Sequence, residues 1–166
     1  METHASWAVR PDGTMADAVF NQHLPAPYGF RDVRSVPGGS KLVAVSTGHH
    51  TLAYGPVVVV DPAYGANNAE AIEIITPRVT PQEGPTAGRP VASGGPPDRG
   101  GTYQTPWALS DSCFLASYSY SNSRTATGFA VYLIDSFGNK ELLHRDQIYS
   151  CSFAMPLQER PKPPLF

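Results

Sequence analysis

Short runs of hydrophobic residues separated by polar turns recur along this chain, and the run at residues 129–134 is the clearest. Its sequence, FAVYLI, is unbroken in apolar and aromatic residues, and the turn SFGN follows Asp135. Such runs between turn residues are typical of β-strands. Because Gly138 and Asn139 tolerate positive φ angles, the turn predicts an antiparallel hairpin whose second strand is residues 140–144. Both faces of the first strand are apolar, so we expect both faces to be covered.

The same kind of run along the rest of the chain predicts an all-β protein. The expected strands are residues 6–10, 15–21, 30–36, 41–46, 57–60, 71–76, 103–109, 112–120, 129–134, 140–144 and 148–153. Pro106 indicates a strand at the edge of its sheet, because proline has no N–H to donate. The content of 17 Pro and 15 Gly also favours a loop-rich β fold over a helical one.

Two patterns of strands and turns, here called segment plans, each occur twice in the chain. One plan, an apolar strand, Asp, a Gly-containing turn and a second strand, is found in VVVVDPAYGANNAEAIEIIT and AVYLIDSFGNKELLHRD. The other, a turn that ends in Ser and then a strand, is found in SVPGGSKLVAVS and ALSDSCFLASYS. Asp61 and Asp135 lie 74 positions apart. Without the Pro- and Gly-rich residues 77–101, the repeat is about 50 residues, at the upper end of propeller-blade lengths.

The repeat predicts a partial β-propeller of about two four-stranded antiparallel blades plus flanking strands. We expect residues 1–155 to form this segment, with residues 77–101 as a Pro/Gly-rich loop insertion and residues 156–166 as a Pro-rich tail or linker. A closed propeller has ~4 to 8 blades. The expected partners are therefore the remaining blades or domains of a parent protein, or further copies through self-association. A small β-sandwich built from the same strands is the alternative.

Four stretches carry a family resemblance: SVPGGSKLVAVSTGHH, TPWALSDSCFLASYS, GFAVYLIDSFGNKELLHRD and the tail MPLQERPKPP. On these residues the chain resembles the middle domain of hydrazine-synthase alpha-subunit-like proteins, a family of bacterial propeller proteins. The resemblance implies a TolB-like propeller domain within a multidomain exported protein, and hence a periplasmic or extracellular location, although no signal peptide is visible. Some members carry haem-binding motifs elsewhere. This chain has no Cys-x-x-Cys-His motif, so we expect no haem and no other cofactor.

The charge and the hydropathy of the chain restrict the classes of partner that it can bind. The formal net charge is −2 and the pI is about 6.2, so no basic field favours nucleic acid. No apolar stretch approaches the ~20 residues of a membrane-spanning helix.

The adjacent His49 and His50 are the weak candidates for a metal site. Two imidazoles after a strand could bind a metal ion or line a pocket. Side chains of consecutive extended residues point in opposite directions, which favours a loop pair hydrogen-bonded to the backbone. No catalytic residue is expected, because no Gly-x-Ser-x-Gly motif activates a serine.

Asp61 and Asp135 end equivalent strands and could bind a cation or act as bases. Hydrogen bonding to the amides of the following turn is the favoured role. Asp146 is similar, with His144 as an alternative partner.

The aromatic residues Tyr118, Tyr120, Tyr132 and Phe129 could stack on a sugar or a base, but packing between blades is favoured. Cys113 and Cys151 are expected to be free thiols rather than a disulfide.

Two functions follow from these observations. The preferred one is a non-catalytic scaffold or interaction segment. The alternative is a part of a larger redox or hydrolytic enzyme, to whose site loops such as that of His49 and His50 contribute.

Overall fold

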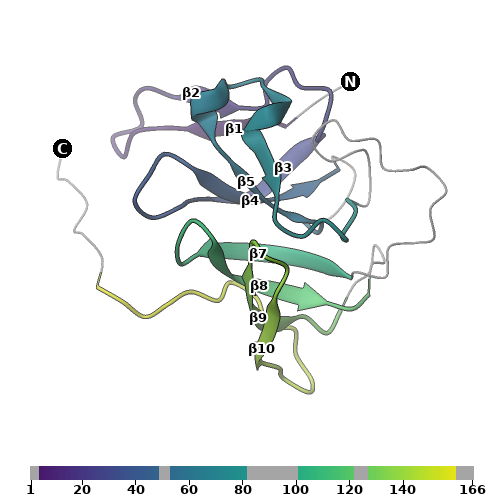
Figure 1. Cartoon of the computed structure of the whole chain (residues 1–166). Coiled ribbons are helices and arrows are strands. Elements are labelled where there is room, and N and C mark those ends of the chain that lie inside the picture. Colours follow the sequence, from purple (N-terminus) through teal and green to yellow (C-terminus); the bar gives the residue numbers. More distant parts are fainter. Residues whose placement is uncertain (1–3, 49–52, 82–100, 122–126, 160–166) are drawn as a thin grey trace.

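The computed structural model describes residues 4–48, 53–81, 101–121 and 127–159, and these form an all-β structure of three antiparallel sheets (Figure 1). The N-terminal hairpin pairs β1 (Ser6–Ala8) with β2 (Asp17–Phe20). The strands of the first sheet are β3 (Gly29–Ser35), β4 (Leu42–Thr47), β5 (Val57–Val60) and β6 (Ile72–Ile74). Those of the second sheet are β7 (Thr102–Ala108), β8 (Cys113–Ser119), β9 (Ala130–Asp135) and β10 (Lys140–His144). Two short 3-10 helices, Pro62–Tyr64 and Ala69–Ala71, lie between β5 and β6.

Both four-stranded sheets pair their strands in chain order, so each is a simple meander. The two repeated segment plans correspond to the first and second halves of these meanders, β3–β4 with β7–β8 and β5–β6 with β9–β10. The two stretches that share each pattern therefore lie at corresponding places in two sheets of one topology. The strand that contains Pro106, β7, is an edge strand, as its proline indicated.

One predicted strand is absent. Residues 148–153 were expected to be extended within a sheet, but no strand is assigned to them in the described part of the chain. They make one backbone hydrogen bond to the second sheet, from the N–H of Cys151 to the carbonyl of Phe129 at 2.8 Å. A strand requires a neighbour that pairs along its length, and this segment meets the sheet mainly through side chains.

The hairpin, the first sheet and the second sheet form successive layers, and the first sheet is buried on both faces (Figure 1). All four valines of β5 are buried. Because alternate side chains of a strand point to opposite faces, Val57 and Val59 pack toward the second sheet, and Val58 and Val60 pack under the hairpin with Phe20. The apolar run of β5 thus joins two cores.

The second sheet is fully covered on one face and partly covered on the other. Its β9 residues Ala130, Tyr132 and Ile134 are buried against the first sheet, whereas Val131 and Leu133 are half-buried. The expectation that both faces of β9 are covered is therefore met in full on the inner face and only in part on the outer face. Among the described residues no further sheet follows the second one, but the chain after β10 contacts it through a hydrogen bond from the N–H of Cys151 to the carbonyl of Phe129.

The junction between the two sheets is formed by their first strands. Asp32 in β3 and Thr105 in β7 both have left-handed backbones, with φ of 54° and 49°, at equivalent breaks in strand register. The backbone N–H of Thr105 donates to Oδ2 of Asp32 at 3.0 Å. Beside it, the backbones of Gly55 and Tyr103 exchange two hydrogen bonds of 3.0 and 3.1 Å.

The chain between β6 and β7 is packed for longer than the sequence indicated. Val79 is buried in the core between the sheets, and its N–H bonds the carbonyl of Thr76 at 3.0 Å. Val79, which lies within the predicted loop insertion, is thus part of the core. Most of the predicted insertion, residues 82–100, lies outside the described residues.

In the described part of the chain, no helix has the length and hydropathy needed to cross a membrane.

Candidate functional site

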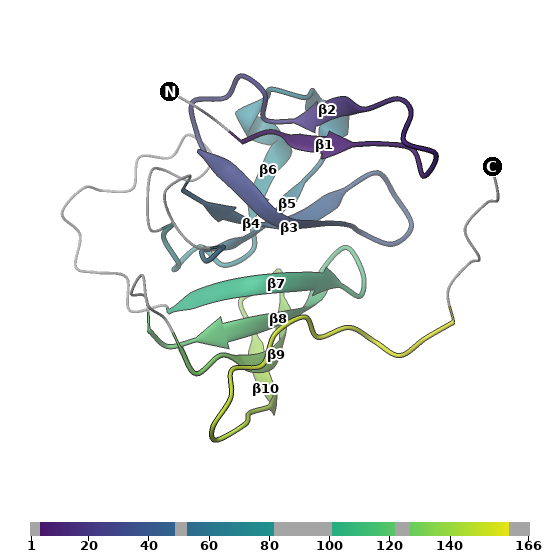
Figure 2. The same ribbon diagram turned by 180° about the vertical axis from the view of Figure 1, so that it is seen from behind.

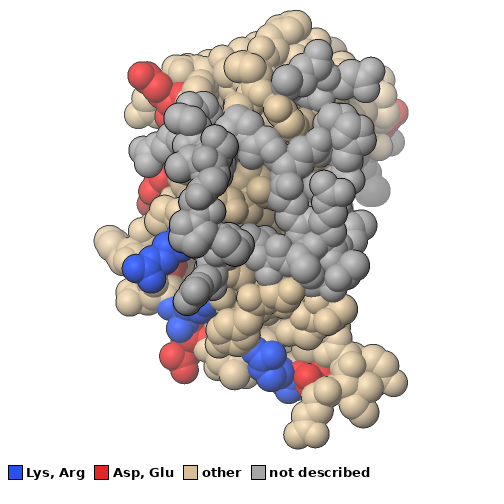
Figure 3. Space-filling view, turned by 90° about the vertical axis from the view of Figure 1, so that its right-hand side faces the viewer, with Lys and Arg blue, Asp and Glu red and all other residues tan. Residues whose placement is uncertain are grey.

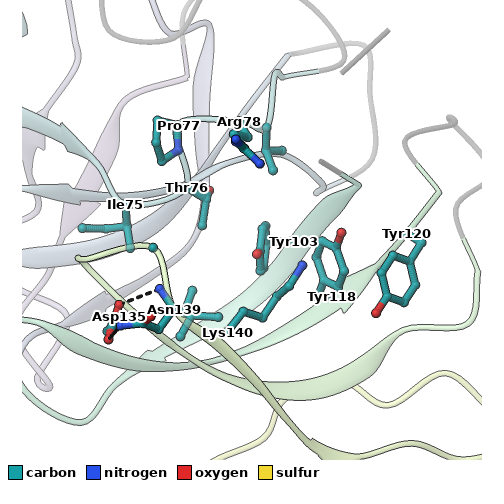
Figure 4. Close-up of a pocket in the computed structure, with 13 residues that line it drawn as sticks. Ile75, Thr76, Pro77, Arg78, Tyr103, Tyr118, Tyr120, Asp135, Asn139 and Lys140 are labelled. Atoms are coloured by element: carbon teal, nitrogen blue, oxygen red, sulfur yellow. Dashed lines mark hydrogen bonds between the residues drawn. The ribbon is translucent and has the colours of Figure 1, made fainter. Parts of the chain in front are cut away.

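A cleft of about 450 Å³ opens between the two sheets and carries several polar side chains (Figure 4). One wall is the chain that leaves β6, including Thr76 and Arg78, and the other is the β9–β10 turn. Tyrosines of β7 and β8 form its floor. We call it the tyrosine cleft; its tyrosines are Tyr103, Tyr118 and Tyr120.

Strand register brings the tyrosine rings together. Tyr103 is paired with Tyr118 across β7 and β8, and their ring centroids are 4.6 Å apart. Tyr120 and Tyr132 meet Tyr118 nearly edge-on, at 5.1 and 5.3 Å. These are favourable geometries for aromatic pairs. The four rings form a rigid surface that continues the core to the edge of the cleft.

Lys140 brings a cation onto this surface. Its register with Ile134 places it on the core-facing side of β10. The ammonium Nζ lies 3.5 Å from the ring centroid of Tyr118, and Figure 4 shows it between Tyr103 and Tyr118. The attraction of the ammonium to ring faces stabilises this position. Partial burial nevertheless removes water from Nζ and lowers the pKa of Lys140.

A second cation contacts the same tyrosines from β10's far end. Nη2 of Arg145 donates to the hydroxyl of Tyr132 at 3.1 Å, and that hydroxyl donates to Tyr120 at 3.3 Å. Burial raises the pKa of Tyr132, as does its hydrogen bond with Tyr120, while Arg145 acts in the opposite direction. Burial is also the main reason why the pKa of Tyr103 is raised. Both phenols are therefore neutral hydrogen-bonding groups near neutral pH.

The carboxylate nearest to this surface is already engaged. Asp135 accepts from the backbone N–H groups of Phe137 and Asn139, both at 2.9 Å, and from Nδ2 of Asn139 at 2.8 Å. The side-chain bond from Asn139 is the largest of the effects that lower the pKa of Asp135. It is the one acidic residue among the described residues that line the cleft. Within the described ranges Lys140 forms no ion pair, so the cleft has an excess of positive charge.

The structural role predicted for the strand-end aspartates is confirmed. Asp61 accepts from the N–H of Ala63 at 3.0 Å, in the same position as Asp135 in its turn. Asp146 accepts from Ile148 and Tyr149 at 2.7 and 2.8 Å, and these backbone bonds lower its pKa more than the charge of His144 does.

The prediction that the aromatic residues pack in the core is confirmed for Tyr118, Tyr132 and Phe129, which are all buried. Tyr120 differs, because its side chain is 66% exposed at the edge of the cleft. Phe129 packs on Tyr54, with centroids 5.1 Å apart, and belongs to a different contact. The sequence reasoning missed Tyr103, Lys140 and Arg145. Side chains alternate between the two faces along β7 and β10, and this alternation places Tyr103 and Lys140 on the core-facing side. That alternation was the signal from which the two residues could have been found.

The predicted metal candidates are not tested, since His49 and His50 lie outside the described residues. Elsewhere, the described ranges contain no group of three or more His, Cys, Asp or Glu side chains arranged to hold a metal ion. Cys113 and Cys151 are free thiols, as expected.

The two ends of the layered stack differ from the tyrosine cleft, because they expose mainly apolar side chains. At the hairpin end, Trp7 and Met15 are 64% and 68% exposed. At the other end, Leu133 of the second sheet is half-buried, and Phe153 and Met155 of the following chain are exposed. In Figure 2 this yellow C-terminal chain crosses in front of the second sheet. Exposed apolar side chains are thus found at both ends of the stack.

Charged side chains show no comparable grouping on the face seen in Figure 3. There the Lys and Arg side chains of the described residues lie beside Asp and Glu side chains, in keeping with the net charge of −2.

Comparison with protein-family models, with curated protein sequences and with solved structures finds no match to this chain.

Proposed function

We propose that this chain is a non-catalytic scaffold segment of a β-propeller, of the kind suggested by its resemblance to the middle domain of hydrazine-synthase alpha-subunit-like proteins. The observation that supports it best is the stacking of two four-stranded meanders of one topology through their first strands. Propeller blades are meanders of this type. The exposed apolar ends of the stack are where further blades belong.

A propeller segment and a self-contained β-sandwich differ in the free energy needed to open each of their sheets. In a segment of a larger stack, the second sheet has one face that is covered only in part, so it opens more readily than the first sheet, which is covered on both faces. In a sandwich the two sheets share one core and open together.

Native-state hydrogen exchange distinguishes these cases. We expect the amides of β5 to exchange with a higher opening free energy than those of β9. A single common opening free energy for Val58, Val59, Val131 and Leu133 would contradict the propeller-segment proposal.

A second candidate function is ligand binding in the tyrosine cleft, through which this segment would contribute site residues to a larger redox or hydrolytic enzyme. The observation that favours it is the ammonium of Lys140, which lies over the ring of Tyr118 in the cleft that Arg78 also lines and has no ion pair in the described structure. An oxyanion, either a carboxylate or a phosphate, would complete its hydrogen bonding.

The test is titration of the labelled protein with acetate and with inorganic phosphate, followed by NMR of the Lys140 side chain and the tyrosine rings. Lys140→Met removes the charge but keeps the aliphatic stem, and Lys41→Met, outside the cleft, is the matched control. We expect shifts in the wild type and in Lys41→Met that are lost in Lys140→Met. Equal shifts in all three proteins, or none in the wild type, would exclude this candidate.

A further inference from the structure

The last described residues repeat the junction between the two sheets. Gly55 and Phe129 each lie six residues before the aspartate that ends a third strand, Asp61 or Asp135. The carbonyl of Gly55 accepts from the N–H of Tyr103 at 3.1 Å, and the carbonyl of Phe129 accepts from the N–H of Cys151 at 2.8 Å. Cys151 therefore lies against the second sheet as Tyr103 of β7 lies against the first.

The correspondence continues two residues further along the chain. Thr105 has a φ of 49°, and Phe153 has a φ of 58°. The N–H of Thr105 donates to the side chain of Asp32 at 3.0 Å, and the N–H of Phe153 donates to Oγ1 of Thr105 at 3.1 Å. Bulky residues at positive φ are rare. Phe153 thus has the same conformation as Asp32 and Thr105, and it is the second residue whose N–H makes this bond. By this correspondence residues 150–157, here called the C-terminal segment, occupy the place of the first strand of a further sheet.

The N-terminal hairpin corresponds to the opposite half of such a sheet. In its turn, the N–H of Arg10 bonds the carbonyl of Thr14 at 2.9 Å, and the N–H of Gly13 bonds the carbonyl of Arg10 at 2.8 Å. The β9–β10 turn has the same two bonds, from Asp135 to Asn139 and from Gly138 to Asp135, and both glycines have positive φ. The hairpin packs on the first sheet as the third and fourth strands of a preceding blade would.

The C-terminal segment and the N-terminal hairpin thus correspond to three of the four strands of one sheet: the first strand, and the third with the fourth. The C-terminal segment lies against the partly covered outer face of the second sheet, and the other end supplies a two-stranded hairpin with Trp7 and Met15 exposed. They lie at opposite ends of the same stack (Figure 1), so one copy cannot bring them together.

We propose that a second copy of this chain docks head to tail, with its N-terminal hairpin over the outer face of the second sheet beside the C-terminal segment. This inference rests on the proposed propeller-type function and names its partner. The contact joins two different surfaces, so it is heterologous, and repetition gives either a ring or an open filament.

The experiment uses two full-length variants that each block one end. Trp7→Asp places a charge on the hairpin end, and Leu133→Glu places one on the outer face of the second sheet. By sedimentation, we expect the wild type to show concentration-dependent association and each variant alone to be monomeric. Because each variant keeps the end that the other lacks, an equimolar mixture should form a one-to-one dimer and nothing larger.

Two results would overturn the inference: a wild type that is monomeric at its highest soluble concentration, or a mixture of the variants that stays monomeric. If Leu133→Glu fails to fold, hydrogen exchange in the wild type decides. The amides of Leu115 and Leu133 should exchange more slowly as the concentration rises, and no change would count against docking. Separate opening of the two sheets in a monomeric protein would leave the propeller-segment proposal standing while the second-copy inference fails.

Discussion

The carboxylate of Asp32 accepts a hydrogen bond from the backbone N–H of Thr105, 73 positions further along the chain, at 3.0 Å. Both residues have left-handed backbones at a break in strand register. Asp adopts this conformation readily, whereas a β-branched residue such as Thr does so at a cost of about 1–3 kcal/mol. The bond therefore holds a strained residue of one sheet against the other.

Asp32→Ala should destabilise the protein. The substitution leaves the N–H of Thr105 without its acceptor, at a cost of ~1–3 kcal/mol, and puts Ala at a positive φ. Asp32→Asn, the matched control, keeps an acceptor oxygen and tolerates this φ, so its loss should be smaller. Urea unfolding measures both, and equal losses would show that the hydrogen bond contributes little.

Thr105→Val should also destabilise the protein, because Oγ1 of Thr105 contacts the hydroxyl of Ser117 at 3.0 Å and accepts from Phe153. We expect a loss of ~1–3 kcal/mol and faster exchange of the Phe153 amide. Thr102→Val, in the same strand, is the control. Oγ1 of Thr102 is buried and has no hydrogen-bond partner among the described residues, so its removal should be neutral or stabilising. The prediction fails if the two variants lose the same stability.

Val59→Ala and Val131→Ala compare a strand that is buried on both faces with a strand whose outer face is covered only in part. Val59 is 2% exposed, so its truncation should cost ~2 kcal/mol, between the usual values for Ile→Val and Leu→Ala. Val131 is half-buried, and the cost there should be below ~1 kcal/mol. Thermal or urea unfolding at low protein concentration gives both values. A cost at Val131 as large as that at Val59 would mean that the outer face of the second sheet is covered in solution.

The β9–β10 turn should make stability depend on pH through Asp135. Its folded-state pKa is lowered by the hydrogen bonds from Asn139 and Phe137. A lowered pKa contributes stability above the unfolded value, about 3.9 for Asp, and that stability is lost as the pH falls through the folded value. We expect an NMR titration midpoint for Asp135 below about 3.9. Asp135→Asn, which does not titrate, should show a smaller loss of melting temperature on acidification, and a midpoint at or above the unfolded value would contradict the assignment.

The architecture was largely predictable because its signals are local. Strands β5 and β10 begin and end where the apolar pattern placed them, and the turns after Asp61 and Asp135 use aspartate as expected. Pro106 indicated the edge position of β7. Each of these features depends on residues within a few positions of one another. The finer prediction of a propeller stays a proposal, since the three sheets do not close on themselves.

The tyrosine cleft could not be predicted, because it depends on contacts between distant segments. Whether Lys140 meets Tyr103 is decided by the register of β7 with β8 and of β9 with β10. The sequence also does not reveal that Phe153 has a positive φ, since Phe normally avoids it. The apolar pattern of residues 148–153 therefore predicts a strand, but no strand of the described chain pairs with these residues.

The left-handed residue in the first strand has a consequence for the geometry of any larger assembly. The same rotation can relate the strand of Asp32 to that of Thr105, and the strand of Thr105 to the segment of Phe153. If it does, the left-handed conformation of these residues fixes the angle between successive sheets. The number of sheets that complete a circle is then set by that angle and not by the length of the chain. In the assembly proposed above, substitutions at Asp32 or Thr105 would then change the number of sheets as well as the stability.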